Sequence, residues 1–162
     1  MGRGAALSVT SAGLLLYRGA DAGVEVLLGH MGGPFWARKD ARAWSIPKGE
    51  HTADEDPHDA AVREFTEEIG HEPPPGPEIA LGTVRLRSGK EVTAWARRAD
   101  LDVAAIVSNT FELEWPPRSG RVQSFPELDR ARWCPLPQAR DLVVAAQVVL
   151  LDRLRDVLEA QD

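Results

Sequence analysis

The chain has 162 residues, of which 43% are hydrophobic and 27% charged, and its formal net charge is −6. This length suits one domain with a buried core, and the composition excludes a fibrous or disordered class, so we expect a single domain over residues 1–162. A net negative charge without a run of basic residues argues against a nucleic acid polymer as a partner. A small anion that arrives with divalent cations is compatible with this charge.

Cysteine usage and apolar runs predict a soluble, cytoplasmic protein. Cys134 is the only cysteine, so no disulfide can form within the chain. The apolar patch at residues 14–16 is too short for the core of a signal peptide. The run at residues 142–151 is interrupted by Gln147 and falls well short of the roughly 20 residues that a membrane span needs. We therefore expect no membrane partner.

Apolar residues that alternate or run together between turn residues predict seven extended segments. In chain order these are residues 7–18, 24–31, 44–46, 79–87, 91–98, 108–115 and 131–136. The first two are joined across a turn at residues 19–23, and the fourth and fifth form a hairpin around Ser88-Gly89. Residues 137–159 are predicted to be helical, either as one helix or as two separated by a turn. With one more helix in the middle of the chain, this pattern predicts a mixed sheet in the α/β or α+β class.

The middle helix is predicted over residues 57–69. Asp56 has a side chain suited to the N-cap, Pro57 suits the first helical position, and Gly70 suits the C-terminal end. The apolar positions of this helix share one side and are Ala61, Val62, Phe65 and Ile69. We therefore expect this side to pack against the sheet.

Three carboxylates are predicted on the opposite side of this helix. Glu64, Glu67 and Glu68 stand at i, i+3 and i+4, and like charges at such spacings destabilise an isolated helix by roughly 0.2–0.5 kcal/mol per pair. One interpretation is a solvated acidic face. The other is a site for a divalent cation, because several carboxylates provide the oxygen ligands that Mg²⁺ or Mn²⁺ prefers.

The wider spacing favours the cation site. Gly49, Glu55, Arg63 and Gly70 stand at fixed intervals around the three glutamates, and the whole pattern resembles the Nudix box. The chain is similar to the Nudix hydrolase family over nearly its whole length. In this family the position after Gly70 is normally a bulky aliphatic residue, whereas here it is His71, a departure that concerns local packing more than the chemistry.

The resemblance implies an α/β/α sandwich around a mixed sheet, with the box forming a loop–helix–loop, and hydrolysis of a diphosphate linked to another group. It implies that Glu64 and Glu68 are the principal metal ligands, that Glu67 shares this role, and that the carbonyl of Gly49 completes the site. The implied cofactor is Mg²⁺, or Mn²⁺ in its place. Arg63 is implied to serve catalysis by holding box carboxylates such as Glu67, with a plain surface ion pair as the alternative.

Hydrolysis of a diphosphate also needs a base for the attacking water. Divalent cations neutralise phosphate oxygens and lower the pKa of a water, and a carboxylate then takes its proton. In Nudix enzymes this base is a box residue or a glutamate of a later loop, so Glu67 and Glu127 are the candidates. Glu127 is also a candidate late metal ligand, because its place before Trp133 resembles that of the late glutamate in dinucleoside polyphosphate hydrolases. Glu112 and Glu114 are the other downstream candidates; they alternate with apolar residues and fit one face of a strand, which could still point toward the site.

Substrate contacts are predicted at Lys48, Trp36 and Arg118. Lys48 stands in "WSIPKGE", which resembles the sequence before the box in diadenosine polyphosphate hydrolases and some MutT-like nucleotide hydrolases, and its charge suits a polyphosphate. A base that stacks on Trp36 would gain about 1–3 kcal/mol, although such a ring more often covers the edge of the core. Arg118 lies in a loop from which it could reach a phosphate. Each of the three is also compatible with an ordinary surface role.

Two function hypotheses follow. The first is a Mg²⁺-dependent hydrolase of a nucleotide-type diphosphate linkage, with a diadenosine polyphosphate preferred and a nucleoside triphosphate as the alternative substrate. The second is a non-catalytic Nudix module that senses a nucleotide or binds a partner protein, and the complete set of acidic box positions argues against it. The expected partner is a small nucleotide or dinucleotide polyphosphate. The apolar C-terminal helix either completes the core or forms the face of a homodimer.

Overall fold

The computed structural model describes residues 10–19, 23–104 and 106–161. Within these residues the strands are β1 (Thr10–Arg18), β2 (Glu25–Met31), β3 (Trp44–Ser45), β4 (Lys48–His51), β5 (Glu78–Arg85), β6 (Glu91–Arg98), β7 (Thr110–Glu114), β8 (Val122–Pro126) and β9 (Leu128–Pro135). The helices are α1 (Pro57–Ile69), α2 (Leu136–Leu142), the short 3₁₀ helix η2 (Ala145–Gln147) and α3 (Val148–Ala160). The predicted mixed α/β class is confirmed.

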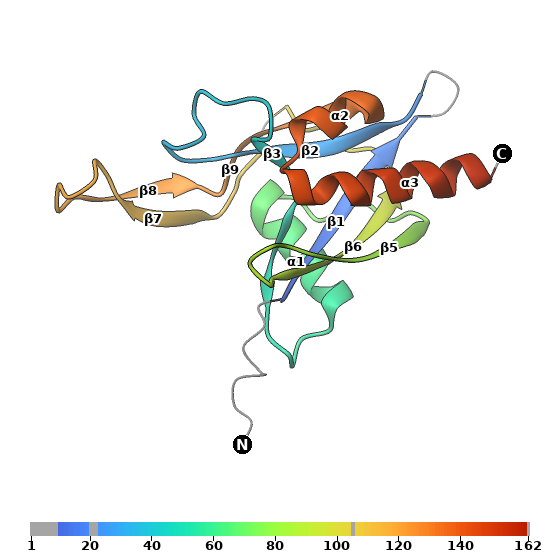
Figure 1. Ribbon diagram of the computed structural model, residues 1–162, viewed down its shortest axis with the longest axis horizontal. Helices are drawn as coiled ribbons and strands as arrows, with labels where there is room; N and C mark the ends of the chain where they lie inside the picture. The colour runs from blue at the N-terminus through green and yellow to red at the C-terminus, as the bar shows by residue number, and fades with distance from the viewer. Residues whose placement is uncertain (1–9, 20–22, 105, 162) are drawn as a thin grey trace.

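The central sheet joins seven of these described strands, in mixed directions (Figure 1). β1 lies in its middle and runs parallel to β6, from Thr10 opposite Glu91 to Tyr17 opposite Arg98. β5 pairs antiparallel with β6, and β4 and β2 share the other side of β1. β2 in turn pairs with β3 and β9. β7 and β8 form a separate hairpin that projects from one end of the molecule (Figure 1).

Helices cover both faces of the central sheet, as the family resemblance implied (Figure 1). Leu14 and Leu16 of β1 pack in one core with Phe65 of α1, whereas Leu15 and Tyr17 belong to the core under α2 and α3. Alternate residues of a strand point to opposite faces, so the single apolar run of β1 supplies both cores. A strand that is buried on both faces reads as a continuous apolar run for the same reason. The result is an α/β/α sandwich.

The helix α1 begins and ends where the sequence predicts. Asp56 accepts a hydrogen bond from the amide of Asp59 at 3.0 Å, and Pro57 occupies the first turn. At the other end Gly70 has a φ of 86°, which favours glycine, and its amide donates to the carbonyl of Thr66 at 2.8 Å. Both ends of the box helix are therefore fixed by its local sequence.

Two strands were not predicted. β4 contains Lys48 and Gly49, where the sequence analysis ended an extended segment, and it pairs antiparallel with the start of β1. β8 is mostly exposed and lacks the apolar alternation that marks a half-buried strand. The first predicted strand begins at Thr10 among the described residues, because positions 7–9 lie outside them, as do residues 20–22 of the predicted turn.

The predicted C-terminal helical segment is divided, as one of the two interpretations proposed. α2 ends at Leu142, Val143 and Val144 are extended, and α3 begins at Val148. The amide of Val144 donates to the carbonyl of Trp44 at 2.9 Å, so the break is fixed to β3 by a backbone hydrogen bond. The sequence analysis assigned Leu136 to a strand, whereas α2 begins at Leu136, so this boundary differs from the prediction by one residue.

The helix α3 completes the core on its side of the sheet. Its buried residues are Leu150, Leu151 and Leu154, which join the cluster formed with α2 and the sheet. This is the first of the two roles expected for the C-terminal helix. No helix in the described part of the chain combines the length and the apolar character that crossing a membrane requires.

Candidate active site

One cavity of about 460 Å³ collects most of the predicted site residues. It lies where β4, α1, the β5–β6 turn and the segment between β8 and β9 approach one another. The predicted residues on its wall are Lys48, Gly49, Glu64, Glu67, Glu68 and Glu127. The predicted residues thus come to one site from three separate parts of the chain: β4, α1 and the segment between β8 and β9.

Two of the three helix glutamates are more buried than the sequence indicated. Glu64 and Glu68 are each 8% exposed, and only Glu67 lies half-exposed on the polar side of α1. The prediction that all three stand opposite the apolar side is therefore wrong for Glu68, whereas Glu64 is buried because β4 covers it. Ala61, Phe65 and Glu68 stand at i, i+4 and i+7, so Glu68 belongs to the same stripe as the apolar residues.

Gly49 provides the space that the Glu64 side chain fills. A Cβ atom built on Gly49 would overlap the carboxylate of Glu64. The first glycine of the box is thus required by a close approach between a helix side chain and the backbone of β4. This contact brings the buried carboxylate of α1 against the strand that carries Lys48.

The carboxylate of Glu68 is fixed by the same strand. Its Oε1 accepts a hydrogen bond from the amide of Lys48 at 3.2 Å. Burial raises the pKa of Glu68 to about 8, against the Lys48 amide and the Lys48 charge, which lower it. Burial is also the main cause that raises the pKa of Glu64, followed by the charge of Glu67 and opposed by Arg63. These two carboxyl groups thus carry unfavourable desolvation in the protein alone.

Arg63 holds three box carboxylates beside the cavity. Its Nε and Nη2 donate to the two oxygens of Glu55 at 2.8 and 2.9 Å. Its Nη1 donates to Glu64 at 2.9 Å and to Glu67 at 3.0 Å. The hydrogen bond from Arg63 is the main cause that lowers the pKa of Glu55. Arg63 does not itself line the cavity, so its position suits the orientation of carboxylates rather than contact with a substrate.

Glu127 lies in the bend between β8 and β9, and its backbone is fixed on both sides. Its amide donates to the carbonyl of Asn109 at 2.9 Å, and its carbonyl accepts from the amide of Gly32 at 3.0 Å. Two residues on, the carboxylate of Asp129 contacts Nδ1 of the fully buried His30 at 3.0 Å. These contacts bring the late glutamate to the acidic wall although it is distant from the box in sequence.

Six further residues line the cavity that the sequence analysis did not select: Ser11, Glu50, Leu86, Lys90, Val92 and Asn109. Lys90 follows the turn between β5 and β6, and its Nζ lies 3.6 Å from Glu50 Oε2 on β4. Both side chains are largely exposed, so this ion pair contributes at most about 1 kcal/mol. A glycine predicted the hairpin turn, but no signal in the local sequence showed that this turn lies close to β4.

Two predicted substrate contacts lie away from the cavity wall. Trp36 packs against the core on the α2 and α3 side of the sheet, with Lys39 Nζ 5.3 Å from its ring centroid. Arg118 is exposed in the turn that joins β7 to β8, the hairpin that projects from the body (Figure 1). His71, at the departure from the family pattern, is exposed, so it replaces no core side chain. The structure thus brings neither Trp36 nor Arg118 to the site.

The ligand types on the cavity wall fit a divalent cation such as Mg²⁺. Five carboxylates and only two lysines line the cavity, so its charge is negative. Carboxylate and carbonyl oxygens are the ligands that Mg²⁺ and Mn²⁺ prefer. A diphosphate alone would be repelled by this wall, whereas a diphosphate with a divalent cation would not.

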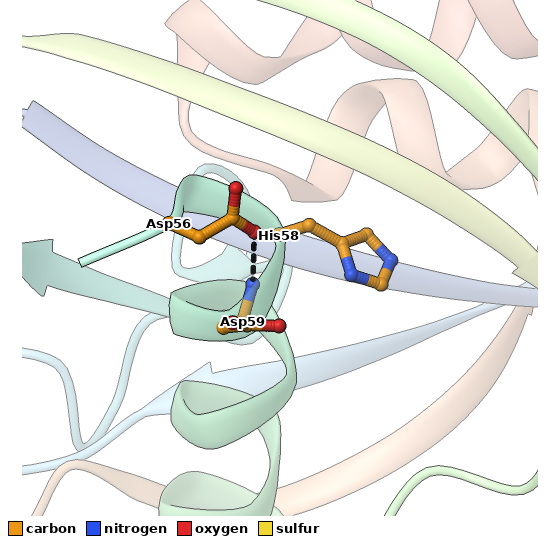
Figure 2. Close-up of side chains that lie close together, drawn as sticks. All are labelled: Asp56, His58 and Asp59. Carbon is orange, nitrogen blue, oxygen red and sulfur yellow. Dashed lines mark hydrogen bonds between the residues drawn. The ribbon is translucent and has the colours of Figure 1, made fainter.

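A second acidic group stands at the other end of α1 and is explained by helix capping. Within the ranges that the structure describes, the ligand atoms of Asp56, His58 and Asp59 lie within 4.8 Å of one another. Figure 2 shows the hydrogen bond by which Asp56 caps the amide of Asp59. His58 Nε2 lies 2.7 Å from Glu78 Oε1 on β5. Asp56 and His58 therefore have structural roles, Asp59 takes part in the cap through its backbone amide, and the group is separate from the cavity.

The family can now be established from the sequence as a whole. The family model described as NUDIX domain matches residues 7–154. The chain belongs to the Nudix family. The resemblance carried by the box is thereby confirmed, and the cavity described above is the place where the box residues meet. No curated protein matches the chain at a significant level.

Solved structures of Nudix proteins share this fold. A binary complex of the C. elegans Ap4A hydrolase has a TM-score of 0.63 at 24% identity, with 93% of this chain and 98% of that chain covered. The NUDIX domain of Shewanella oneidensis NrtR, in complex with ADP ribose, has a TM-score of 0.61 at 18% identity, with 93% and 88% covered. A MutT protein from Methanosarcina mazei Go1 has a TM-score of 0.59 at 21% identity, with 94% and 96% covered. Similarity at these identities shows the fold, which hydrolases share with a protein bound to ADP ribose.

Proposed function

We propose that this chain hydrolyses a diphosphate linkage in a nucleotide-type substrate, with a diadenosine polyphosphate preferred, and that it requires Mg²⁺, or Mn²⁺ in its place. The observation that carries the proposal is the single cavity at which the three box glutamates meet Glu127 and Lys48. The carboxylates suit a divalent cation, and Lys48 suits a phosphate group of the substrate. Lys48 and Glu127 also support the substrate ranking, because both resemble features of dinucleoside polyphosphate hydrolases.

The proposed metal ligands are Glu64, Glu67 and Glu68, with the carbonyl of Gly49, and Glu127 is either a late ligand or the base. When bound, Mg²⁺ neutralises phosphate charge and acidifies water. The protein's own contribution is to keep these oxygens in place before the substrate arrives. Glu68 is held by the backbone of β4, and Glu64 fills the space that Gly49 leaves open. Such preorganisation lowers the reorganisation needed during the reaction.

Arg63 is proposed as a positioning residue. Its guanidinium bonds Glu55, Glu64 and Glu67 at once, so the orientation of two proposed ligands depends on it. Lysine could not reproduce this contact set, because an ammonium group lacks the planar fork of a guanidinium. Arg63→Lys is therefore expected to raise the Mg²⁺ concentration needed for half-maximal activity. A lower kcat at an unchanged Mg²⁺ requirement would argue for direct contact with substrate.

Glu127 is proposed as the proton acceptor, with a role as late metal ligand as the alternative. Glu67 is the other candidate base, but one of its oxygens accepts a hydrogen bond from Arg63. Glu127 reaches the cavity from a separate segment whose backbone is fixed by Asn109 and Gly32. If Glu127 is the base, Glu127→Gln lowers kcat and leaves the affinity for Mg²⁺ unchanged. If it is a ligand, Mg²⁺ affinity measured by calorimetry falls as well.

The substrate is tested with a panel of compounds in the presence of Mg²⁺. The panel holds nucleoside triphosphates, dinucleoside polyphosphates, nucleotide sugars, ADP-ribose and diphosphoinositols, and products are identified by chromatography. We expect the highest kcat/KM for a diadenosine polyphosphate. A preference for nucleoside triphosphates would favour the MutT-like alternative. A preference for ADP-ribose over every polyphosphate would contradict our ranking.

The mechanism is tested by Glu68→Gln. We expect kcat/KM to fall on the order of 1,000-fold, because a buried carboxylate of the cation site is lost. Glu72→Gln is the matched control, since Glu72 is an exposed glutamate just beyond α1 and is expected to retain wild-type activity. Wild-type activity in Glu68→Gln would show that the proposed mechanism is wrong. Binding of nucleotides by the wild-type protein without any turnover would favour the non-catalytic sensing module.

The state of the chain in solution is a separate prediction. We propose one Nudix domain over residues 1–162, with a homodimer and a monomer as the two alternatives for its assembly. Limited proteolysis that leaves one stable fragment of nearly full length would support the single domain. Light scattering at the mass of one chain would contradict the homodimer.

A further inference from the structure

A β-bulge interrupts the pairing of β2 with β9 next to the acidic cavity. His30 pairs with Arg130, and the next pair is Met31 with Leu128, so Asp129 is an extra residue in β9. Because alternate residues of a strand point to opposite faces, an extra residue exchanges the faces of the residues before it. Bulges of this kind are frequent beside active sites, where they redirect a side chain. The bulge therefore decides to which side the residues just before it, among them the late glutamate, are directed.

The packing of β9 shows this exchange of faces. Ala131 packs against the core under α1, so continued alternation would direct Asp129 to the same core. Leu128 lies in that core instead and is 4% exposed. Its side chain fills the space beside Gly29, where an added Cβ atom would overlap it. Glu127, the residue before Leu128, lines the acidic cavity.

The extra residue is held by the buried ring of His30. The His30 side chain is fully buried, and its Nδ1 lies 3.0 and 3.1 Å from the two carboxylate oxygens of Asp129. Its Nε2 lies 2.7 Å from the carbonyl oxygen of Lys39, which can only accept, so Nε2 carries a proton and donates this hydrogen bond. Nδ1 and a carboxylate oxygen at this distance likewise need a proton between them. The imidazole ring thus ties the bulge to the loop that follows β2.

We propose that His30 is a positioning residue for the reaction, which holds the bulge at Asp129 so that Glu127 faces the cavity. The inference rests on the proposed function, in which Glu127 is the base or a late metal ligand. The backbone supports it, because the amide of Gly32, two residues after His30, donates to the carbonyl of Glu127 at 3.0 Å. His30 does not line the cavity, so its effect on the reaction must pass through the bulge. A role in stability alone would lower the folded fraction without changing kcat per folded molecule.

Two substitutions at His30 separate its two hydrogen bonds. The side-chain nitrogen of asparagine can take the place of Nδ1 and that of glutamine the place of Nε2, and both amide nitrogens donate. His30→Asn thus keeps the bond to Asp129, whereas His30→Gln keeps only the bond to Lys39. We expect His30→Asn to retain kcat within about threefold and His30→Gln to lower it about 10–100-fold, with KM within about threefold of wild type in both. Equal kcat values for the two variants would overturn the proposal.

The same contact is tested from the side of Asp129, whose side chain is partly exposed, in case the variants of the buried His30 fail to fold. Asp129→Asn retains an oxygen that accepts from Nδ1, whereas Asp129→Ala removes it. Only Asp129→Ala is expected to lower kcat, again about 10–100-fold. Asp141→Ala, which removes an exposed carboxylate of α2, is the control and should match wild type. Wild-type kcat in Asp129→Ala would overturn the proposal.

A double-mutant cycle shows whether His30 acts through Glu127. If it does, His30→Gln lowers kcat by less than about threefold in a Glu127→Gln background, because the group that it positions is already lost. A full loss of about 10–100-fold in that background would overturn the proposal, since the two effects would then be independent.

Hydrogen exchange tests the bulge without any substrate. The amide of Glu127 donates to the carbonyl of Asn109 at 2.9 Å, so its exchange rate reports how firmly this segment is held. We expect faster exchange in His30→Gln and the wild-type rate in His30→Asn, with the amide of Leu154 in α3 as the reference. This pattern in a protein that hydrolyses no nucleotide would contradict the proposed function and support the positioning by His30. Hydrolysis by the wild type, with the same Glu127 exchange rate in both variants, would support the function and overturn the positioning.

Discussion

The helices α1 and α3 are both 13 residues long, and each packs against one face of the central sheet. They differ in what they bury. The buried residues of α3 are leucines, whereas α1 buries Glu64 and Glu68 beside residues such as Phe65. Burying like-charged carboxylates opposes folding, since both desolvation and mutual repulsion raise their free energy. Packing explains the buried leucines of α3, whereas the two buried glutamates of α1 are explained by the divalent cation that we propose.

The substitution Glu68→Gln is the most direct test of this difference between α1 and α3, because we expect it to raise stability and to lower activity. Glutamine keeps an oxygen that can accept the Lys48 amide, but it lacks the charge whose burial raises the pKa of Glu68 to about 8. In metal-free buffer at neutral pH, we expect the free energy of unfolding to rise by about 1 kcal/mol or more. The same variant should lose activity on the order of 1,000-fold.

Urea denaturation with a chelator present measures the first effect of Glu68→Gln, and initial rates with Mg²⁺ measure the second. Glu72→Gln again provides the control, with neither quantity changed. A less stable Glu68→Gln protein would mean that the buried carboxylate is already compensated by the fold. In that case α1 and α3 would not differ in the way described.

The substitution Leu154→Ala should show the opposite behaviour in α3. Leu154 is fully buried in the core, so its truncation leaves a cavity and is expected to lower the free energy of unfolding by about 2–5 kcal/mol. The kcat/KM per folded molecule should stay within about twofold of wild type. Val149→Ala removes a half-exposed side chain from the same helix and should change stability by less than about 0.5 kcal/mol. A large loss of activity in folded Leu154→Ala would show that α3 also shapes the site.

The parts of the site that were predictable from sequence are those set by local signals, and the parts that were missed depend on packing between distant segments. The box helix was predicted to the residue because its signals are local: Asp56 caps one end and Gly70 ends the other. Lys90 was missed, because its approach to β4 depends on how a whole hairpin packs. Glu127 was selected through resemblance to a family, and the local sequence could not show which strands deliver it. Trp36 was ambiguous from the start, since an aromatic side chain suits both a stacking surface and the edge of a core.

The burial of Glu64 was likewise beyond the sequence. Helical periodicity placed it on the polar side, but β4 passes close enough to cover it, and this depends on Gly49 having no side chain. Periodicity describes the faces of one helix, whereas burial depends on the elements around it. The need for glycine at a close approach can be recognised only in the folded structure, where the two segments lie against each other.

The substitution Gly49→Ala tests whether β4 allows Glu64 of α1 its buried position. The added Cβ atom would overlap the carboxylate of Glu64, so the glutamate must move from its buried position. We expect kcat/KM to fall about 10–100-fold, an effect typical of misplacing a group that supports a metal site. His51→Ala, in the same strand, should stay within about threefold of wild type. Mg²⁺ affinity should fall together with activity, and a loss of activity at unchanged affinity would place the effect of Gly49 elsewhere.

The smallest expected effect concerns Glu78, a carboxylate that has protein partners. Burial alone would raise the pKa of Glu78, but hydrogen bonds from Arg97 and from His58 of α1 outweigh it and hold the pKa below its ordinary value of 4.5. A depressed pKa stabilises the folded state above the unfolded-state pKa, and this contribution is lost as the pH falls through the folded-state pKa. Glu78→Gln should therefore lower stability at pH 7 by less than about 1 kcal/mol.

The difference between Glu78→Gln and wild type should shrink as the pH falls below 4.5, so the variant has a flatter acid limb in urea midpoints measured against pH. Glu72→Gln, which alters an exposed carboxylate, should keep the wild-type slope. Parallel acid limbs for Glu78→Gln and wild type would contradict the assignment. Glu78 and Glu68 then mark the two uses of a carboxylate in this fold. The first is stabilised by hydrogen bonds from Arg97 and His58, whereas burial disfavours the charge of the second, and we propose that a divalent cation offsets this cost.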